Sequence, residues 1–233
     1  MIASFAVGLM LKAGVPNKVI SLLVGESSII GNILLGSDKI GGVVFTGSNA
    51  SAQNINSIIS TRQGSIIPFI AETGGQNAML IDSSALLEHA CDDILVSAFG
   101  SAGQRCSALR VLYIQEEIKE PLINMLKGAL KELQIGDPRK LYTDMGPVID
   151  EKSKNSLQEH IQKMLADHEL IANIEISENQ ELKKGHFIAP HIFSINSIKD
   201  LENEVFGPIL HIISFKTEGI DNVIDEINST GYG

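Results

Sequence analysis

The chain has few cysteines and no excess of positive charge. It contains two cysteines, Cys91 and Cys106, and no C-x-x-C pair. The disulfide framework of a secreted domain would need more cysteines, so we expect a reducing, cytoplasmic compartment. The formal net charge is −10 at pH 7. Nucleic acid requires a basic face, and we therefore expect no nucleic-acid partner.

Several common site motifs are also missing. The six histidines include no H-E-x-x-H pair and no two at metal-ligand spacing on one helical face, so we expect no metal site. The chain has no Walker loop, no G-x-S-x-G elbow and no G-x-G-x-x-G fingerprint. Only eleven residues precede Lys12 in the apolar N-terminal stretch, too few to span a bilayer, and we expect no direct membrane insertion.

What is present is an ordinary globular composition with two alternating periodicities. Hydrophobic residues make up 44% of the 233, enough for a core without a disulfide or metal. In the first eighty residues the pattern predicts helices over 1–13, 27–36 and 48–60 and strands over 19–25, 40–47, 65–72 and 77–82. Ser48 is placed to cap the third of these helices. Strands that alternate with helices indicate an α/β fold with a parallel sheet.

The rest of the chain is again mixed. We predict helices over 85–100, 116–133, 151–168 and 219–229, strands over 110–115, 187–193 and 209–215, and a Gly/Pro-marked loop over 134–150. No Gly/Ser linker separates the two parts, so the boundary between domains is expected to be tight, near Thr73 to Gln76.

The stretch SAGQRCSALR places Cys106 in an unusual setting. Its neighbours are small, Arg105 precedes it, and Arg110 follows four residues later. The thiolate is the reactive form of cysteine, and a nearby guanidinium or helix N-terminus favours it. The alternative is a buried cysteine that acts only as a small hydrophobe. That alternative is much stronger for Cys91, which shares a helical pattern with Leu87 and Leu95.

Three further segments could carry chemistry. Glu72 ends an apolar strand before two glycines, where a carboxylate can serve as a general base, or lie in a solvated turn. VVFTGS ends a strand at Gly47 and opens a helix, a geometry that suits a phosphate. In EVFGP, Glu204 could hold ribose hydroxyls and Phe206 could flank a flat heterocycle, or the segment is a turn with one core phenylalanine.

Together the segments FTGS, E-x-G-G, G-Q-x-C and E-x-F-G-P, in this order, resemble the aldehyde dehydrogenase superfamily over the whole chain. The stretch from IAETGGQNAMLID to GQRCSALRVL, with MGPVID, EVFGPILHI and INSTGYG, is similar to the Δ1-pyrroline-5-carboxylate dehydrogenase domain of bacterial proline utilization A proteins. The resemblance implies NAD-dependent oxidation of glutamate γ-semialdehyde to glutamate. By it, Cys106 attacks the aldehyde, a hydride passes to NAD, and Glu72 activates the water that hydrolyses the resulting thioester.

The resemblance also implies the other site residues. NAD contacts are expected at Phe45, Gly47, Ser48, Gly74, Glu204 and Phe206. The substrate carries a carboxylate, and we expect Arg105 or Ser107, beside the nucleophile, to bind it.

The resemblance further implies a partial Rossmann-type NAD-binding domain over 1–73 and most of an α/β catalytic domain over 74–233, incomplete at its C-terminus. Family segments expected upstream and downstream are missing, so we expect an exposed sheet edge and a poorly stable chain. It would act as a homo-oligomer or beside the remaining parts of a larger proline utilization protein. The alternatives are an inactive remnant that keeps the fold without turnover, and a thiol-dependent redox protein or hydrolase that uses Cys106 without NAD.

Overall fold

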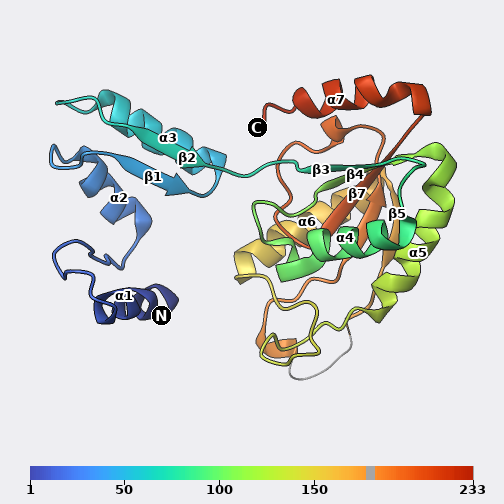
Figure 1. Cartoon of the computed structure of the whole chain (residues 1–233), viewed down its shortest axis with the longest axis horizontal. Helices are drawn as coiled ribbons and strands as arrows, with labels where there is room; N and C mark the ends of the chain where they lie inside the picture. Colours follow the sequence, from blue (N-terminus) through green and yellow to red (C-terminus); the bar gives the residue numbers. More distant parts are fainter. Residues whose placement is uncertain (177–181, 233) are drawn as a thin grey trace. The chain divides into compact units, whose positions relative to one another are not determined.

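The computed structural model describes residues 1–176 and 182–232. The chain divides into two compact units, Met1–Thr73 and Gly74–Gly233, drawn in blue to cyan and in green to red in Figure 1. We refer to them as unit 1 and unit 2.

Unit 1 is a small α/β unit built around one parallel strand pair. Its elements are the helices α1 (Ile2–Lys12), α2 (Ser27–Gly36) and α3 (Asn49–Thr61) and the strands β1 (Val43–Thr46) and β2 (Phe69–Glu72). The strands run parallel with Thr46 opposite Glu72, and α3 connects them as the crossover helix of a β-α-β motif. Ser48 is the N-cap of α3 and accepts a hydrogen bond from the backbone N–H of Ser51 at 3.3 Å, which confirms the predicted cap.

Two strand predictions in unit 1 are wrong, one wholly and one in part. The apolar stretch 19–25 forms no strand, and its side chains Val19, Leu23 and Val24 are exposed. A strand needs a neighbour for its backbone hydrogen bonds, and the sheet of unit 1 has only β1 and β2 in the described part of the chain. The strand predicted over 65–72 begins only at Phe69, directly after Pro68, because proline has no N–H to donate to a ladder.

Unit 2 contains a five-stranded sheet with the order β3-β4-β7-β6-β5. The strands are β3 (Ala78–Ile81), β4 (Val111–Gln115), β5 (Glu169–Asn173), β6 (His191–Ser194) and β7 (Ile209–Phe215). The helices are α4 (Leu87–Phe99), α5 (Lys119–Glu132), α6 (Glu151–Asp167) and α7 (Ile220–Asn228). Short 3₁₀ turns lie at Gly100–Gly103, Glu116–Ile118, Leu182–Lys184, Ile198–Asp200 and Thr217–Gly219. All pairings are parallel except β5 with β6.

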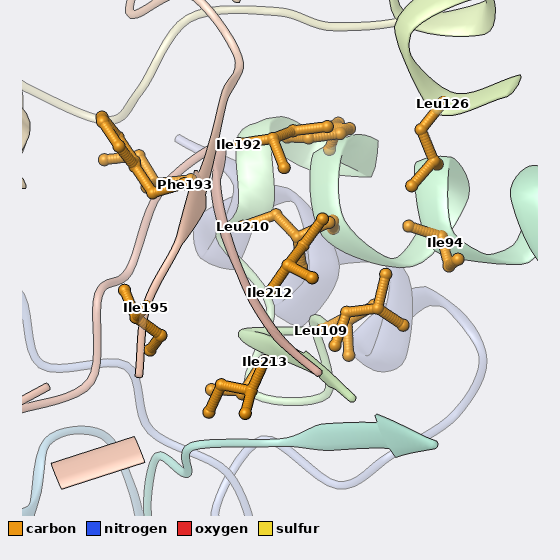
Figure 2. Close-up of a cluster of buried hydrophobic side chains, with 14 of the residues drawn as sticks. Ile94, Leu109, Leu126, Ile192, Phe193, Ile195, Leu210, Ile212 and Ile213 are labelled. Atoms are coloured by element: carbon orange, nitrogen blue, oxygen red, sulfur yellow. The ribbon is translucent and has the colours of Figure 1, made fainter. Parts of the chain in front are cut away.

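The core of unit 2 surrounds the two central strands. Every residue of β4 is buried, as is nearly every residue of β7, which is the pattern of a parallel strand covered on both faces. Figure 2 shows part of this core, in which Leu210 and Ile212 of β7, Ile94 of α4 and Leu126 of α5 belong to one buried cluster. The α/β class with parallel pairing is confirmed, and the helices predicted in unit 2 form within a few residues of the expected bounds.

The far edge of this sheet differs from the prediction. Strand β5 was not predicted, and it pairs antiparallel with β6 through an irregular register between Leu170 and Ala172. The strand predicted over 187–193 begins at His191, again directly after a proline, Pro190. None of the described helices is both long and apolar enough to cross a membrane.

Candidate active site

Cys106 lies in a strained turn between α4 and β4. Three consecutive residues before it, Ser101, Ala102 and Gly103, have positive φ values of 56°, 54° and 66°. Only glycine adopts this region without steric cost, so the surrounding structure must hold the first two there. A side chain at Gly103 would also collide with the carbonyl oxygen of Gly207. The turn leaves Cys106 exposed as a free thiol.

The second cysteine has the opposite environment. Cys91 is 4% exposed in the core of unit 2, and burial raises the pKa of its thiol. A buried thiol with a raised pKa is inert, which confirms that Cys91 acts as a small core residue.

Side-chain amides fix the turn that carries Cys106. The Nδ2 atom of Asn77 donates to the carbonyl oxygens of Cys106 and Ala108 at 2.6 and 2.8 Å. Gln104 accepts from the backbone N–H of Ile149 at 2.8 Å and donates to the carbonyl oxygen of Pro147 at 3.3 Å. The backbone around the thiol is thus held from two sides.

A buried ion pair connects this turn with the EVFGP segment. The guanidinium of Arg110 bonds to the carboxylate of Glu204 at 2.9 Å, and the two side chains are 1% and 16% exposed. The same guanidinium lies over the ring of Phe206, 5.1 Å from its centroid. Burial lowers the pKa of Arg110, while the ion pair with Glu204 and the attraction of a charged Cys106 oppose that shift. The pKa of an arginine lies far above neutral pH, so the guanidinium of Arg110 stays charged.

The carboxylate of Glu204 also lies against Gly74. A methyl group on Gly74 would occupy the place of the Oε2 atom of Glu204, so this position accepts only glycine while Glu204 keeps its orientation. A cleft of about 770 Å³ adjoins the carboxylate, lined by Glu204, Phe206 and side chains of α6. Unit 2 therefore brings Cys106, Gly74, Glu204 and Phe206 into one region.

The residues of this region of unit 2 lie in segments that come before strands. Gly74 and Asn77 come before β3, Arg110 comes directly before β4, and the Glu204–Phe206 segment comes before β7. Because β3, β4 and β7 are adjacent and parallel, their amino ends meet at the same edge of the sheet.

The remaining predicted residues lie in unit 1, at the carboxyl ends of its strands. Glu72 ends β2 with its side chain exposed, and its carbonyl oxygen accepts from the N–H of Gly47 at 3.1 Å. A methyl group on Gly47 would lie 2.5 Å from the ring of Phe45. The structure thus groups Phe45, Gly47, Ser48 and Glu72.

Unit 1 also has a groove beside this group. It has a volume of about 860 Å³ and is lined by residues of α2, β1 and α3, among them Phe45, Asn54 and Ile55. All of its lining residues belong to unit 1.

The two residues expected to bind a substrate carboxylate differ in their contacts. Ser107 is exposed beside Cys106. Arg105 is exposed too, but its guanidinium donates to the carbonyl oxygen of Val96 in the last turn of α4, at 2.7 Å. Cations are favoured at this end of a helix. Arg105 can bind a carboxylate only with the donors that this bond does not use.

Sequence reasoning named Arg110 only as one of two guanidinium groups near Cys106, and it gave no role to Asn77 and Gln104. The signal for Arg110 was a charged residue directly before the strand VLYIQ, which is apolar up to its last residue, Gln115. Asn77 likewise follows Gly74 and Gly75 at a strand entry. Among the residues that the structure describes, no group of three or more acidic, histidine or cysteine side chains could hold a metal ion.

The fold and the site define a class of protein. Unit 2 has an exposed cysteine in a glycine-rich turn, and unit 1 has a glutamate at the end of a parallel strand and a helix that begins after Gly47 and Ser48. The model of the aldehyde dehydrogenase family matches residues 1–233. The chain belongs to the aldehyde dehydrogenase family.

Individual relatives agree with this assignment. The chain is 44% identical over its full length to the bifunctional protein PutA of Klebsiella aerogenes, of which it covers 18%. It is 32% identical over its full length to 1-pyrroline-5-carboxylate dehydrogenase of Bacillus subtilis, of which it covers 45%. The chain therefore spans about a fifth and about half of the lengths of these two relatives.

Solved structures show the same fold. The crystal structure of proline utilization A from Bradyrhizobium japonicum matches with a TM-score of 0.93 at 44% identity, over all of this chain and 23% of that one. Betaine aldehyde dehydrogenase from Staphylococcus aureus in complex with NAD⁺ matches with a TM-score of 0.86 at 27% identity, over 95% of this chain and 43% of that one.

Proposed function

We propose that this chain carries the catalytic cysteine of an NAD-dependent dehydrogenase that oxidises glutamate γ-semialdehyde to glutamate in proline breakdown. The observation that carries the proposal is the exposed thiol of Cys106 in a turn bonded to the same arginine as Glu204. The relatives named PutA and 1-pyrroline-5-carboxylate dehydrogenase support the substrate.

In this proposal the chemistry begins at the sulfur atom. The thiolate of Cys106 attacks the aldehyde carbon, and the backbone N–H of Cys106 donates to the oxygen that becomes negative. Oxidation of this adduct leaves a thioester on Cys106. Glu72 then takes a proton from water, which hydrolyses the thioester and releases the acid.

The residues present fit an NAD molecule. The N-terminus of α3, directly after Gly47 and Ser48, offers N–H groups and a positive helix end to a phosphate. The groove of unit 1 has the size of a nucleotide site and Phe45 in its lining. In unit 2 the carboxylate of Glu204 faces a cleft and can accept from ribose hydroxyls. When bound, NAD would accept the hydride.

The carboxylate of the substrate is assigned to Ser107 and Arg105. Both are exposed beside Cys106, and an arginine is a strong partner for a carboxylate. Arg105→Ala should raise KM for glutamate γ-semialdehyde much more than KM for an uncharged aldehyde of similar length. Equal changes in KM for both aldehydes would show that Arg105 does not bind the substrate carboxylate.

The experiment that tests the proposed function is NADH formation by the purified chain with NAD and glutamate γ-semialdehyde. Cys106→Ala should abolish the signal. Glu72→Gln should lower kcat by about 10²-fold or more, the usual contribution of a general base. Glu88→Gln, which changes another exposed acid, on α4, should leave kcat unchanged.

The outcomes separate the alternatives. NADH formation that persists in Cys106→Ala would refute the cysteine mechanism. Turnover of an ester or a thiol reagent without NAD would favour a cofactor-independent cysteine protein. A folded chain that gives no NADH would leave two alternatives, the inactive remnant and a catalytic part that turns over only beside the remaining parts of a larger proline utilization protein.

A further inference from the structure

Arg110 is the most completely buried charged side chain near Cys106, with 1% exposed. Its Nη1 atom donates to the carbonyl oxygen of Gly103 at 2.6 Å, and its Nη2 atom donates to that of Arg105 at 3.0 Å. Nη2 also bonds to the Oε1 atom of Glu204 at 2.9 Å. One guanidinium thus holds the backbone on the amino side of Cys106 and the carboxylate of a segment that lies almost a hundred residues further along the chain.

Stability alone does not explain this arrangement. The Nε atom of Arg110 is buried and has no hydrogen-bond partner among the described residues, which costs free energy. A buried ion pair is in general no more stabilising than apolar side chains of the same volume. The buried charge therefore points to a role in the site, where one cation can fix the geometry of two segments.

The neighbouring arginine does not fill this role. The guanidinium of Arg105 is bonded to Val96 at the end of α4, so Arg105, although next to Cys106 in sequence, stabilises a helix terminus. Arg110 is four residues away in sequence, yet it is the arginine bonded to the Cys106 turn.

We propose that Arg110 is the positioning residue of this site, which holds the Cys106 turn and Glu204 in one arrangement and places a positive charge beside the turn that carries the thiol. The proposal rests on the proposed function, in which Cys106 is the nucleophile and Glu204 accepts hydrogen bonds from the ribose hydroxyls of NAD. The guanidinium is bonded to the carboxylate of Glu204, and Cys106 and His211 are near enough to interact with its charge.

The test measures the alkylation of Cys106 by iodoacetamide as a function of pH, in a Cys91→Ala background with one remaining thiol. Only the thiolate reacts, so the pH of half-maximal rate reports how strongly the site favours it. For Arg110→Met we expect this pH to rise by about one unit and the rate at pH 7 to fall about tenfold. Arg110→Lys keeps the charge and should restore most of the rate.

A matched control separates charge from loosening of the turn. Asn77→Ala also removes two hydrogen bonds to carbonyl oxygens of this turn, those of Cys106 and Ala108, but removes no charge. It should keep the half-maximal pH of the parent chain. If Arg110→Met does not fold, as judged by circular dichroism, Arg110→Gln replaces it and should show the same rise.

Two results would overturn the proposal. One is a half-maximal pH in the uncharged Arg110 variant within about 0.2 units of the parent, a difference too small for a nearby charge. The other is an equal rise in Asn77→Ala. Alkylation needs neither NAD nor aldehyde, so a chain that fails to form NADH can still confirm the role of Arg110, and an active chain can still refute it.

Discussion

The stability of unit 2 should depend on pH through a pair of buried histidines. The Nε2 atoms of His160 on α6 and His211 on β7 are 3.0 Å apart, and the Nδ1 atom of His211 lies 3.1 Å from the carbonyl oxygen of Arg110. A carbonyl only accepts, so Nδ1 of His211 carries a proton and donates it. In the neutral ring Nε2 then accepts, and His160 must be its donor.

Protonation of His211 would break this arrangement. A second proton on Nε2 would face the donor of His160, and the ring is 0% exposed. Burial lowers the pKa of His211 to about 3, and the nearby charges of His160, His168 and Arg110 contribute in the same direction. Burial also lowers the pKa of His160, to about 4, with Lys163 and His168 contributing.

The sign of the effect follows from these directions. Between pH 6.5 and about 4 the unfolded chain binds protons at these rings that the folded chain does not. The contribution of the two neutral rings to the free energy of unfolding is complete above pH 6.5 and is lost as the pH falls. From pH 7.5 to 5 the loss through His211 is about 2 kcal/mol, set almost entirely by the unfolded pKa of 6.5. The partly exposed ring of His160 adds less.

Urea unfolding at several pH values measures this loss. The three tyrosines all lie in unit 2 and the chain has no tryptophan, so tyrosine fluorescence reports unit 2 alone. His211→Asn keeps an N–H near the position of Nδ1 and should lose about 2 kcal/mol less than the parent on acidification. His89→Gln, at an exposed position, should behave as the parent does. An equal loss in His211→Asn and the parent would refute the reasoning.

Three further changes test individual contacts in unit 2. Gly74→Ala places a methyl group on the carboxylate of Glu204, so we expect it to raise KM for NAD in the NADH assay; an unchanged KM would contradict the placement of Glu204. Leu126→Ala removes a side chain that is 1% exposed in the core and should cost about 2–5 kcal/mol of unfolding free energy, measured by urea unfolding; a cost below about 1 kcal/mol would mean that the site repacks. Glu226→Ala removes the acceptor of the Tyr113 hydroxyl, which lies 3.1 Å away, and should cost about 1–3 kcal/mol; the removal of both partners in the double variant with Tyr113→Phe should cost less than the sum of the single changes.

The sequence predicted elements well where periodicity and capping agreed. The helices α2 and α3 and the strand β7 lie within a residue or two of their expected bounds, because apolar spacing and a cap or a glycine mark them. The errors share a cause. The stretch 19–25 is as apolar as a strand but has no partner in the described sheet of unit 1, and the entries of β2 and β6 are set by Pro68 and Pro190. Partners of a strand are a tertiary property that a local pattern does not contain.

The site was predictable as separate segments and not as a connected structure. Cys106, Glu72 and Glu204 each stood out because a reactive group lay within three residues of a glycine. Their links did not, since Arg110 and Asn77 act through carbonyl oxygens and no side-chain pattern marks an acceptor on the backbone. The bond from Arg105 to Val96 was equally hidden, and so was the fact that Arg110 bonds to the carbonyl oxygens of Gly103 and Arg105 in the turn.

Strand order is what brings the segments together. Ligands of open parallel sheets usually bind at the carboxyl ends of the strands, and Gly47, Ser48 and Glu72 follow this rule in unit 1. In unit 2 the candidate residues sit instead at the amino ends of β3, β4 and β7. A chain order of β3, β4, β5, β6, β7 would separate β4 from β7 by two strands. The observed order places them side by side, and Arg110 reaches Glu204 for that reason. The ion pair is therefore a consequence of topology, and variants that disturb the pairing of β4 with β7 should disturb Cys106 as well.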